Sequence, residues 1–242
     1  MNPISRRSCL AGVLATLAGL GASRHGQAAA LAAEERPVVG FDAVLWDATG
    51  ELLIEQTNRE RLVVEAEPAV LAKIVAEVRD GRLHLRFRPG PVQTQQPIRF
   101  RLEVKTLTAL ETRGSGAVRI GTLSLPALSL RLTGSEELQL AGLTARRLDV
   151  QLEGAGSLRI AAGRVDSQRV VISGAADYDA LGLASRHADV AITGSGELRV
   201  AVTERLVARI AGSGTVLYRG QPQLVQTITG AGEIRPLDAR GP

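Results

Sequence analysis

Apolar and polar residues alternate along most of this chain, and from residue 107 to residue 236 the alternation is arranged around a recurring glycine. Apolar residues stand two positions before most of these glycines and four positions after them, as Leu132 and Leu138 do around Gly134. Alternation with a period of two is typical of half-buried strands. A glycine between two such runs indicates a tight corner, because glycine reaches positive φ without a steric penalty. The seven corner glycines are Gly114, Gly134, Gly154, Gly174, Gly194, Gly212 and Gly230.

The spacing of these glycines predicts the architecture. They lie 20 residues apart four times in succession and then 18 residues apart twice. A unit of this length cannot bury its own apolar face, but stacked units can, at about 4.8 Å per strand. We therefore predict an all-β, parallel β-helix-like solenoid with coils of about 20 residues and inward residues such as Leu158. A meandering antiparallel sheet also explains the alternation, but it does not explain why the corner recurs in phase with it.

Residues 38–106 contain strand-like runs without the glycine phrase and form the N-terminal part of the same predicted domain. Between two of the runs, Pro68–Val78 has apolar residues at helical spacing, which predicts a short helix covering a sheet edge or the solenoid end. Residues 31–37 are expected to be a polar tether, residues 107–236 the repeated coils, and residues 237–242 a tail. The strand-like runs are Val39–Trp46, Glu51–Gln56, Arg61–Ala66, Arg82–Phe87 and Ile98–Val104.

Residues 1–30 have the layout of a bacterial export signal. Arg6 and Arg7 precede an uncharged run from Cys9 to Ser23, and Ala28–Ala30 offers a small-residue cleavage site. The paired arginines indicate the twin-arginine route, with ordinary Sec export as the alternative. We expect cleavage near residue 31, a periplasmic or secreted protein, and no integral membrane span once the signal is removed.

The charge and the cysteine content of the chain bear on nucleic-acid binding, disulfide bonds and cysteine-bound metal. The whole chain has 29 basic and 25 acidic residues, and the predicted signal contains three of the arginines and none of the acids. The mature protein would be nearly neutral, which gives no support to nucleic-acid binding. Its single cysteine, Cys9, lies within the signal, so neither disulfides nor cysteine-bound metal are expected in the mature chain.

The order of elements resembles the bacterial GIN-domain family, usually described as the head domain of auto-transporter adhesins. The resemblance covers about residues 38–236 and rests on the exported N-terminus, on Phe41-Asp42-Ala43-Val44 in an opening strand, on Leu83-His84-Leu85, and on the repeated Gly-Ser-Gly corners. It implies a right-handed β-helix-like fold in a secreted or envelope-associated protein, in line with the right-handed bias of parallel crossovers. It brings no catalytic residues.

One repeat departs from the pattern, because Asp177 and Asp179 occupy both of its outward positions. In one interpretation they are cation ligands or a paired acid and base. In the other they belong to a surface charge ladder, in which Asp179 faces Arg159 and Arg199 on adjacent coils. A calcium site would require more oxygen ligands than this cluster supplies.

The sequence shows no catalytic, cofactor-binding or metal-binding constellation. His84 and His187 are the only histidines outside the signal, and neither stands at a recognisable spacing from a carboxylate or a nucleophile. We expect a non-enzymatic solenoid that binds or scaffolds an envelope component or a glycan, with self-association through its ends or faces as a further expectation. The alternative is a carbohydrate-active enzyme or a lectin-like module that uses the outward stripe around Asp177 and Asp179.

Overall fold

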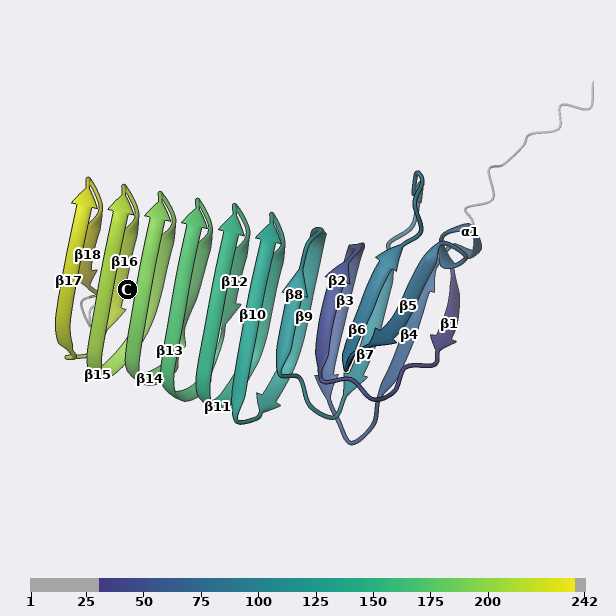
Figure 1. Cartoon of the computed structure of the whole chain (residues 1–242), viewed down its shortest axis with the longest axis horizontal. Coiled ribbons are helices and arrows are strands. Elements are labelled where there is room, and N and C mark those ends of the chain that lie inside the picture. Colours follow the sequence, from purple (N-terminus) through teal and green to yellow (C-terminus); the bar gives the residue numbers. More distant parts are fainter. Residues whose placement is uncertain (1–30, 238–242) are drawn as a thin grey trace, which may run out of the picture.

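Residues 31–237, the part of the chain that this computed structural model describes, form an elongated β-solenoid of about six turns (Figure 1). The expected export signal in residues 1–30 and all but the first residue of the expected tail lie outside this part. The N-terminal strands are β1 (Ala32–Arg36), β2 (Ala43–Asp47), β3 (Thr49–Gln56), β4 (Arg61–Ala66), β5 (Ile74–Arg79), β6 (Arg82–Phe87) and β7 (Arg99–Val104).

The repeated coils supply the remaining strands, and several of these are long because they continue round the bend opposite the glycine corner. They are β8 (Ala109–Thr112), β9 (Ser115–Ser124), β10 (Ala127–Gly134), β11 (Glu137–Gly154), β12 (Ser157–Ile160), β13 (Gly163–Gly174), β14 (Asp177–Gly194), β15 (Glu197–Gly212), β16 (Thr215–Arg219), β17 (Gln223–Gly230) and β18 (Glu233–Pro236).

The strands form two facing sheets. The first sheet, turned toward the viewer in Figure 1, runs β5, β6, β2, β8, β10, β11, β13, β14, β15, β17. The second sheet runs β1, β4, β7, β3, β9, β11, β12, β14, β15, β16, β18. In both sheets the strands of the repeated coils pair in parallel, so the meandering antiparallel alternative is wrong.

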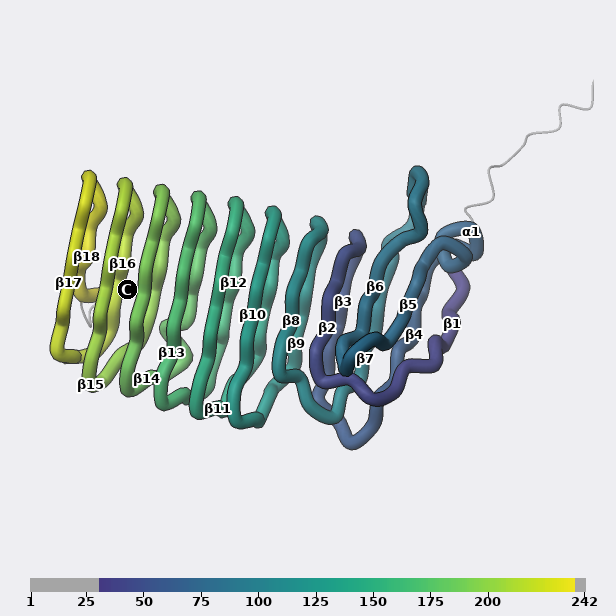
Figure 2. Tube along the Cα trace, viewed as in Figure 1, coloured from purple at the N-terminus to yellow at the C-terminus, as the bar shows by residue number. Residues whose placement is uncertain are grey.

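The corner glycines lie in register from coil to coil, as the spacing predicts (Figure 2). At Gly154, for example, φ is +114°, and a side chain would meet the backbone of Gly134 in the coil before it. The corner therefore requires glycine for its backbone angle and for the close approach of the neighbouring coil.

The space between the sheets is filled by aliphatic side chains. The inward positions of every coil before the last are almost fully buried; Leu158 and the neighbouring Tyr178 are 1% exposed, and Leu138 on the other side of Leu158 is 0% exposed. The few large rings that the chain contains are also inside, including Trp46 and Tyr178. Stacking thus buries the apolar rows that no single coil could bury alone.

The shortening of the period from 20 to 18 residues has a local explanation. The pairing of β14 with β15 is interrupted between Ala180 and Ala184 and again between Ser185 and His187. Both irregularities lie in the bend opposite the glycine corner, so the later coils lose residues there while the apolar rows and the corner keep their register.

Two local predictions need correction. The helix expected over Pro68–Val78 is the short α1 (Pro68–Leu71), and from Ile74 onward that segment belongs to β5, which pairs antiparallel with β6. The β-branched Ile74 and Val75 fit that pleated edge as well as they fit a helix face. Residues 31–37, expected to be a tether, contain β1, which pairs with β4. Within residues 31–237 no helix is long and apolar enough to cross a membrane.

Candidate functional site

The four residues predicted as candidates lie on the outer surface of the second sheet. Arg159 on β12, Asp179 on β14 and Arg199 on β15 stand directly opposite one another on three successive strands. Asp177, two residues before Asp179, stands between Ser157 and Glu197. The structure therefore brings all four together on one exposed face.

These residues make fewer and longer contacts than the side chains of a catalytic or metal-binding site usually do. Asp177 accepts a hydrogen bond from the backbone N–H of Glu197 at 3.4 Å, and Asp179 accepts one from that of Leu181 at 3.3 Å. Arg199 makes its ion pair with Glu197, at 2.5 Å. Among the described residues no ion pair joins Asp179 to either arginine, and no group of three or more metal-ligating side chains gathers anywhere in residues 31–237.

The arginines of this region belong to a longer pattern. Along one outward row of the second sheet, an arginine stands on every second strand, and the strands between them carry other residues. We call this the arginine row. In strand order it reads Arg101, Leu53, Arg119, Gln139, Arg159, Asp179, Arg199, Leu217 and Arg235. Two strand spacings separate successive arginines, which is about 9.6 Å.

A second row runs beside the first, two residues earlier on each strand. We call it the acidic row because five of its nine positions are acidic. In strand order it reads Arg99, Glu51, Ala117, Glu137, Ser157, Asp177, Glu197, Thr215 and Glu233. Ion pairs link the two rows, between Arg119 and Glu51, between Arg199 and Glu197, and, at 3.4 Å, between Arg235 and Glu233. We refer to the two rows together as the charged band.

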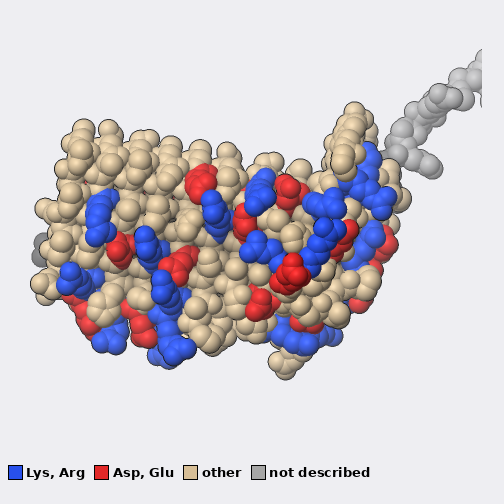
Figure 3. Space-filling model, viewed as in Figure 1, with Lys and Arg blue, Asp and Glu red and all other residues tan. Residues whose placement is uncertain are grey.

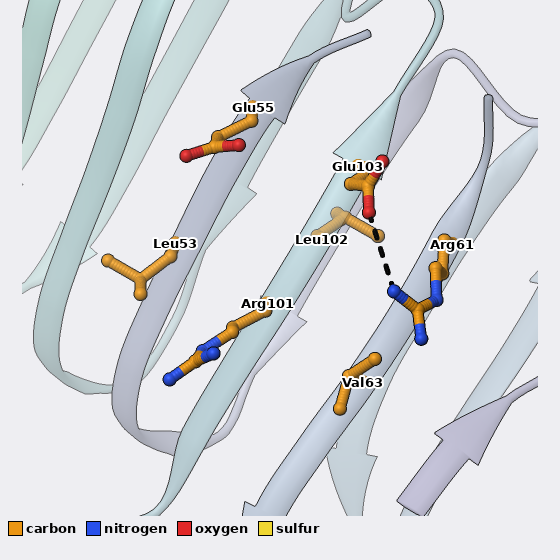
Figure 4. A pocket seen from close by; sticks show the side chains of 7 residues that line it. All are labelled: Leu53, Glu55, Arg61, Val63, Arg101, Leu102 and Glu103. Carbon is orange, nitrogen blue, oxygen red and sulfur yellow. Dashed lines mark ion pairs between the residues drawn. The ribbon is translucent and has the colours of Figure 1, made fainter. Parts of the chain in front are cut away.

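A hollow of about 520 Å³ lies at the N-terminal end of the charged band (Figure 4). Arg101 and Glu103 on β7 stand in its middle, flanked by residues of β3 and β4. Leu53 and Val63 give it apolar surface, and Arg61 lies 3.8 Å from Glu103 at its edge. The hollow therefore presents guanidinium, carboxylate and aliphatic groups side by side.

The charges around this hollow hold one another in their ionised forms. A hydrogen bond from Arg59 lowers the pKa of Glu103 below its usual value. A hydrogen bond from Arg61 likewise lowers the pKa of Glu35, and the pKa of Arg61 is raised in return. These are the directions expected of surface ion pairs. A general acid near neutral pH would need the opposite direction for its carboxyl group.

The first sheet carries its own charged patches, which Figure 3 shows over the N-terminal strands and along the side away from the glycine corners. A hollow of about 330 Å³ on this face is lined by Arg169, His187 and Arg205 among others. His187 lies 3.4 Å from Glu204, which Arg186 also contacts. The glycine corners, at the top of the picture, show no charge because the residues there are Ser, Ala and Gly, apart from Glu136, which is 1% exposed.

A buried polar chain inside the solenoid was not predicted. The Tyr178 hydroxyl donates to Gln168 Oε1 at 2.9 Å, Gln168 Nε2 donates to Ser185 Oγ at 2.8 Å, and Ser185 Oγ donates to the carbonyl of Ala201 at 2.8 Å. Burial is the main cause that raises the pKa of Tyr178. Gln168 pairs with Leu148 and Ala188 on an inward row, and a polar residue at such a position is the signal that could have revealed the chain.

Comparison with known proteins agrees with this architecture. The family model described as "Putative auto-transporter adhesin, head GIN domain" matches residues 40–222. None of the curated proteins matches this chain.

Solved structures share the fold at low sequence identity. A putative adhesin from Bacteroides fragilis superposes with a TM-score of 0.81 at 21% identity, over 86% of this chain and 97% of that one. A putative adhesin and a putative lipid binding protein, both from Parabacteroides distasonis, each give a TM-score of 0.69 with the same coverage, at 20% and 22% identity. At these identities the likeness shows the fold alone.

Proposed function

Because the chain belongs to the family described as "Putative auto-transporter adhesin, head GIN domain", we propose that it is an exported, non-enzymatic binding module of the cell envelope. Two of the structurally similar proteins are described as putative adhesins, which supports an adhesin-like role. The signal-like residues 1–30 support export to the periplasm or beyond.

The charged band is the surface that we assign to binding, and the observation that carries this assignment is its regularity. Like charges directly opposite each other on adjacent strands destabilise a sheet. Placing an arginine on every second strand avoids that cost and still gives a straight row of cations along the second sheet. Folding alone does not require the row, since exposed charges contribute little to stability.

A ligand that matches this row is linear and carries its own charges at a spacing of about 9.6 Å, two strand spacings. An acidic polysaccharide with one carboxylate in each disaccharide has that character. Guanidinium groups bind carboxylates through paired hydrogen bonds, and the neighbouring glutamates can accept hydrogen bonds from sugar hydroxyls. Exposed aromatic platforms are not needed for this mode, in keeping with the burial of Trp46 and Tyr178.

The test is binding of the purified protein to an array of bacterial surface polysaccharides, with lipid vesicles as a separate arm. We expect binding to acidic polymers that weakens as salt is added. Changing Arg199 to Glu should weaken it about tenfold or more, since one charge of the row is reversed. Changing Arg131 to Glu on the first sheet is the matched control: both arginines pair with a glutamate, and their side chains are 44% and 48% exposed.

Equal losses in the two variants, or no binding to any acidic polymer, would contradict the assignment to the charged band. A variant with Asp177 and Asp179 both changed to Ala addresses the enzymatic alternative. If the unchanged protein turns over a glycan and this double variant does not, at an unchanged melting temperature, the hypothesis of a carbohydrate-active enzyme replaces that of a binding module.

A further inference from the structure

The two ends of the solenoid differ. At the N-terminal end the strands turn antiparallel, and the edge strands, β1 of the second sheet and β5 of the first, both carry charged residues (Figure 1). At the other end, β17 pairs only with β15 and β18 only with β16 among the described residues. One edge of each sheet therefore presents unpaired backbone groups at the C-terminal end.

The edge formed by β17 lacks the features that normally prevent strand pairing. Edge strands are usually protected by charged residues, proline, bulges or a covering element. The eight residues of β17, from Gln223 to Gly230, include no charged residue and no proline. Two of its apolar side chains, Val225 and Ile228, are 42% and 40% exposed.

We propose that this end is an interface for a second copy of the chain, whose β17 and β18 pair antiparallel with those of the first about a twofold axis. This inference does not depend on the proposed function. The charged edge strands β1 and β5 at the N-terminal end are protected against pairing. A twofold arrangement of the C-terminal ends uses up both open edges, so it gives a dimer rather than a filament.

The backbone on both sheets is oriented for this pairing. The N–H of Ser129 in β10 donates back to Thr108 in the preceding coil, and Val225 occupies the equivalent position in β17. The backbone N–H and C=O groups of successive residues point to opposite sides of a strand. Val225 therefore directs its groups toward the preceding coil, and Ile228, three residues later, directs its N–H and C=O away from the solenoid. Glu233 donates back to Gly214, so Ile234 likewise directs its backbone groups outward.

Ile228 and Ile234 stand on opposite sheets, on either side of the corner that begins at Gly230. Ile228 lies two residues before Gly230 and Ile234 lies four residues after it, so each is three residues from the centre of the corner. A twofold axis passing next to both residues would place each opposite its own copy, as a hydrogen-bonded antiparallel pair. Their side chains, which lie over the end of the aliphatic core, would then cover each other.

The charges on β18 are self-complementary in this arrangement. With Ile234 opposite Ile234 of the second copy, Glu233 stands opposite Arg235 of that copy, and the symmetry makes the pair twice. On β17 the matching outward pair is Thr227 with Thr229, which introduces no charge. Opposite charges at directly opposed positions favour antiparallel pairing, and like charges oppose it.

The experiment measures the oligomeric state of the purified protein by sedimentation velocity over a dilution series. We expect a monomer–dimer equilibrium with no larger species. Glu233→Arg and Arg235→Glu should each raise the dimer dissociation constant about tenfold or more, because each replaces two opposite-charge pairs with like-charge pairs. Both side chains are more than half exposed, so the variants should fold normally, which circular dichroism checks.

Three further preparations make the test specific. An equimolar mixture of the two single variants should form a mixed dimer about as tightly as the unchanged protein, and the double variant Glu233→Arg/Arg235→Glu should dimerise alone. A chain ending at Leu237 should still dimerise. The proposal is overturned if the unchanged protein is monomeric at every concentration, if the single variants and their mixture behave alike, or if removing the residues after Leu237 abolishes the dimer.

Discussion

The close approach of the coils at the glycine corner makes a quantitative prediction for Gly154→Ala. The φ of Gly154 is +114°, where an alanine costs about 1–3 kcal/mol. Its methyl carbon would stand 2.5 Å from the carbonyl oxygen of Gly134, well inside van der Waals contact. That oxygen accepts the hydrogen bond from Ala155 N–H, at 3.0 Å.

Relieving the clash must push the two coils apart at the corner, which weakens this hydrogen bond. The bond contributes about 0.5–1.5 kcal/mol. Adding the conformational cost, we expect Gly154→Ala to lower the free energy of unfolding by about 2–4 kcal/mol. Urea titration followed by far-ultraviolet circular dichroism measures this change.

Two other glycines separate the contributions. Gly81 also has positive φ, +74°, but an added carbon there would meet nothing within 4 Å, so Gly81→Ala should cost only about 1–2 kcal/mol. At Gly121 the nearest atom, the carbonyl oxygen of Ile54, would be 3.7 Å away, and φ lies outside the positive region, so Gly121→Ala should be within about 0.5 kcal/mol of neutral. A Gly154 variant no worse than the Gly81 variant would refute the argument from coil approach.

Three further changes test the core and the surface charges. Leu158→Asp places an unpaired charge among buried aliphatic side chains and should destabilise by several kcal/mol, so thermal melting should find the protein unfolded or nearly so. Tyr178→Phe leaves Gln168 Oε1 without its donor and should cost about 1–3 kcal/mol in urea unfolding; a neutral result would mean that the buried polar chain is not formed. Glu103 has a lowered pKa in the folded protein, so its ion pairs stabilise the fold above the unfolded value of 4.5 and lose that effect as the pH falls through the folded pKa. Glu103→Gln should therefore flatten the acid side of the stability profile, and unchanged profiles would count against the Arg59 contact.

The repeated part of the fold could be predicted because its two requirements leave separate marks in the sequence. The stacked sheets need aliphatic residues at alternate positions, and the corner needs glycine, as at Gly134 and Gly154. Outside the repeats, a short apolar run can be interpreted either as a helix or as a strand. Ile74 and Val75 fit a helix face and a strand edge equally well, and only the pairing with β6 decides between them.

The candidate residues were predicted as a group, but their wider context was not. Single repeats show Asp179 between Arg159 and Arg199, whereas the arginine row also includes Arg101 and its neighbour Leu53, which come from outside the repeats. The strand order near the N-terminus, in which β3 lies between β7 and β9, could not be predicted from local sequence. The row becomes visible only when that order is known.

The apolar rows lie inside the solenoid and the charged rows lie outside it, so the binding proposal can be tested with single surface substitutions. A charged residue in place of a core residue such as Leu158 should unfold the protein, so that substitution says nothing about binding. Arg199 and Arg131, in contrast, lie on opposite sheets, are about equally exposed, and each pair with one glutamate. Reversing either charge should change stability by no more than about 1 kcal/mol. A difference in binding between these two variants would therefore report which sheet contacts the ligand and not how well each variant folds.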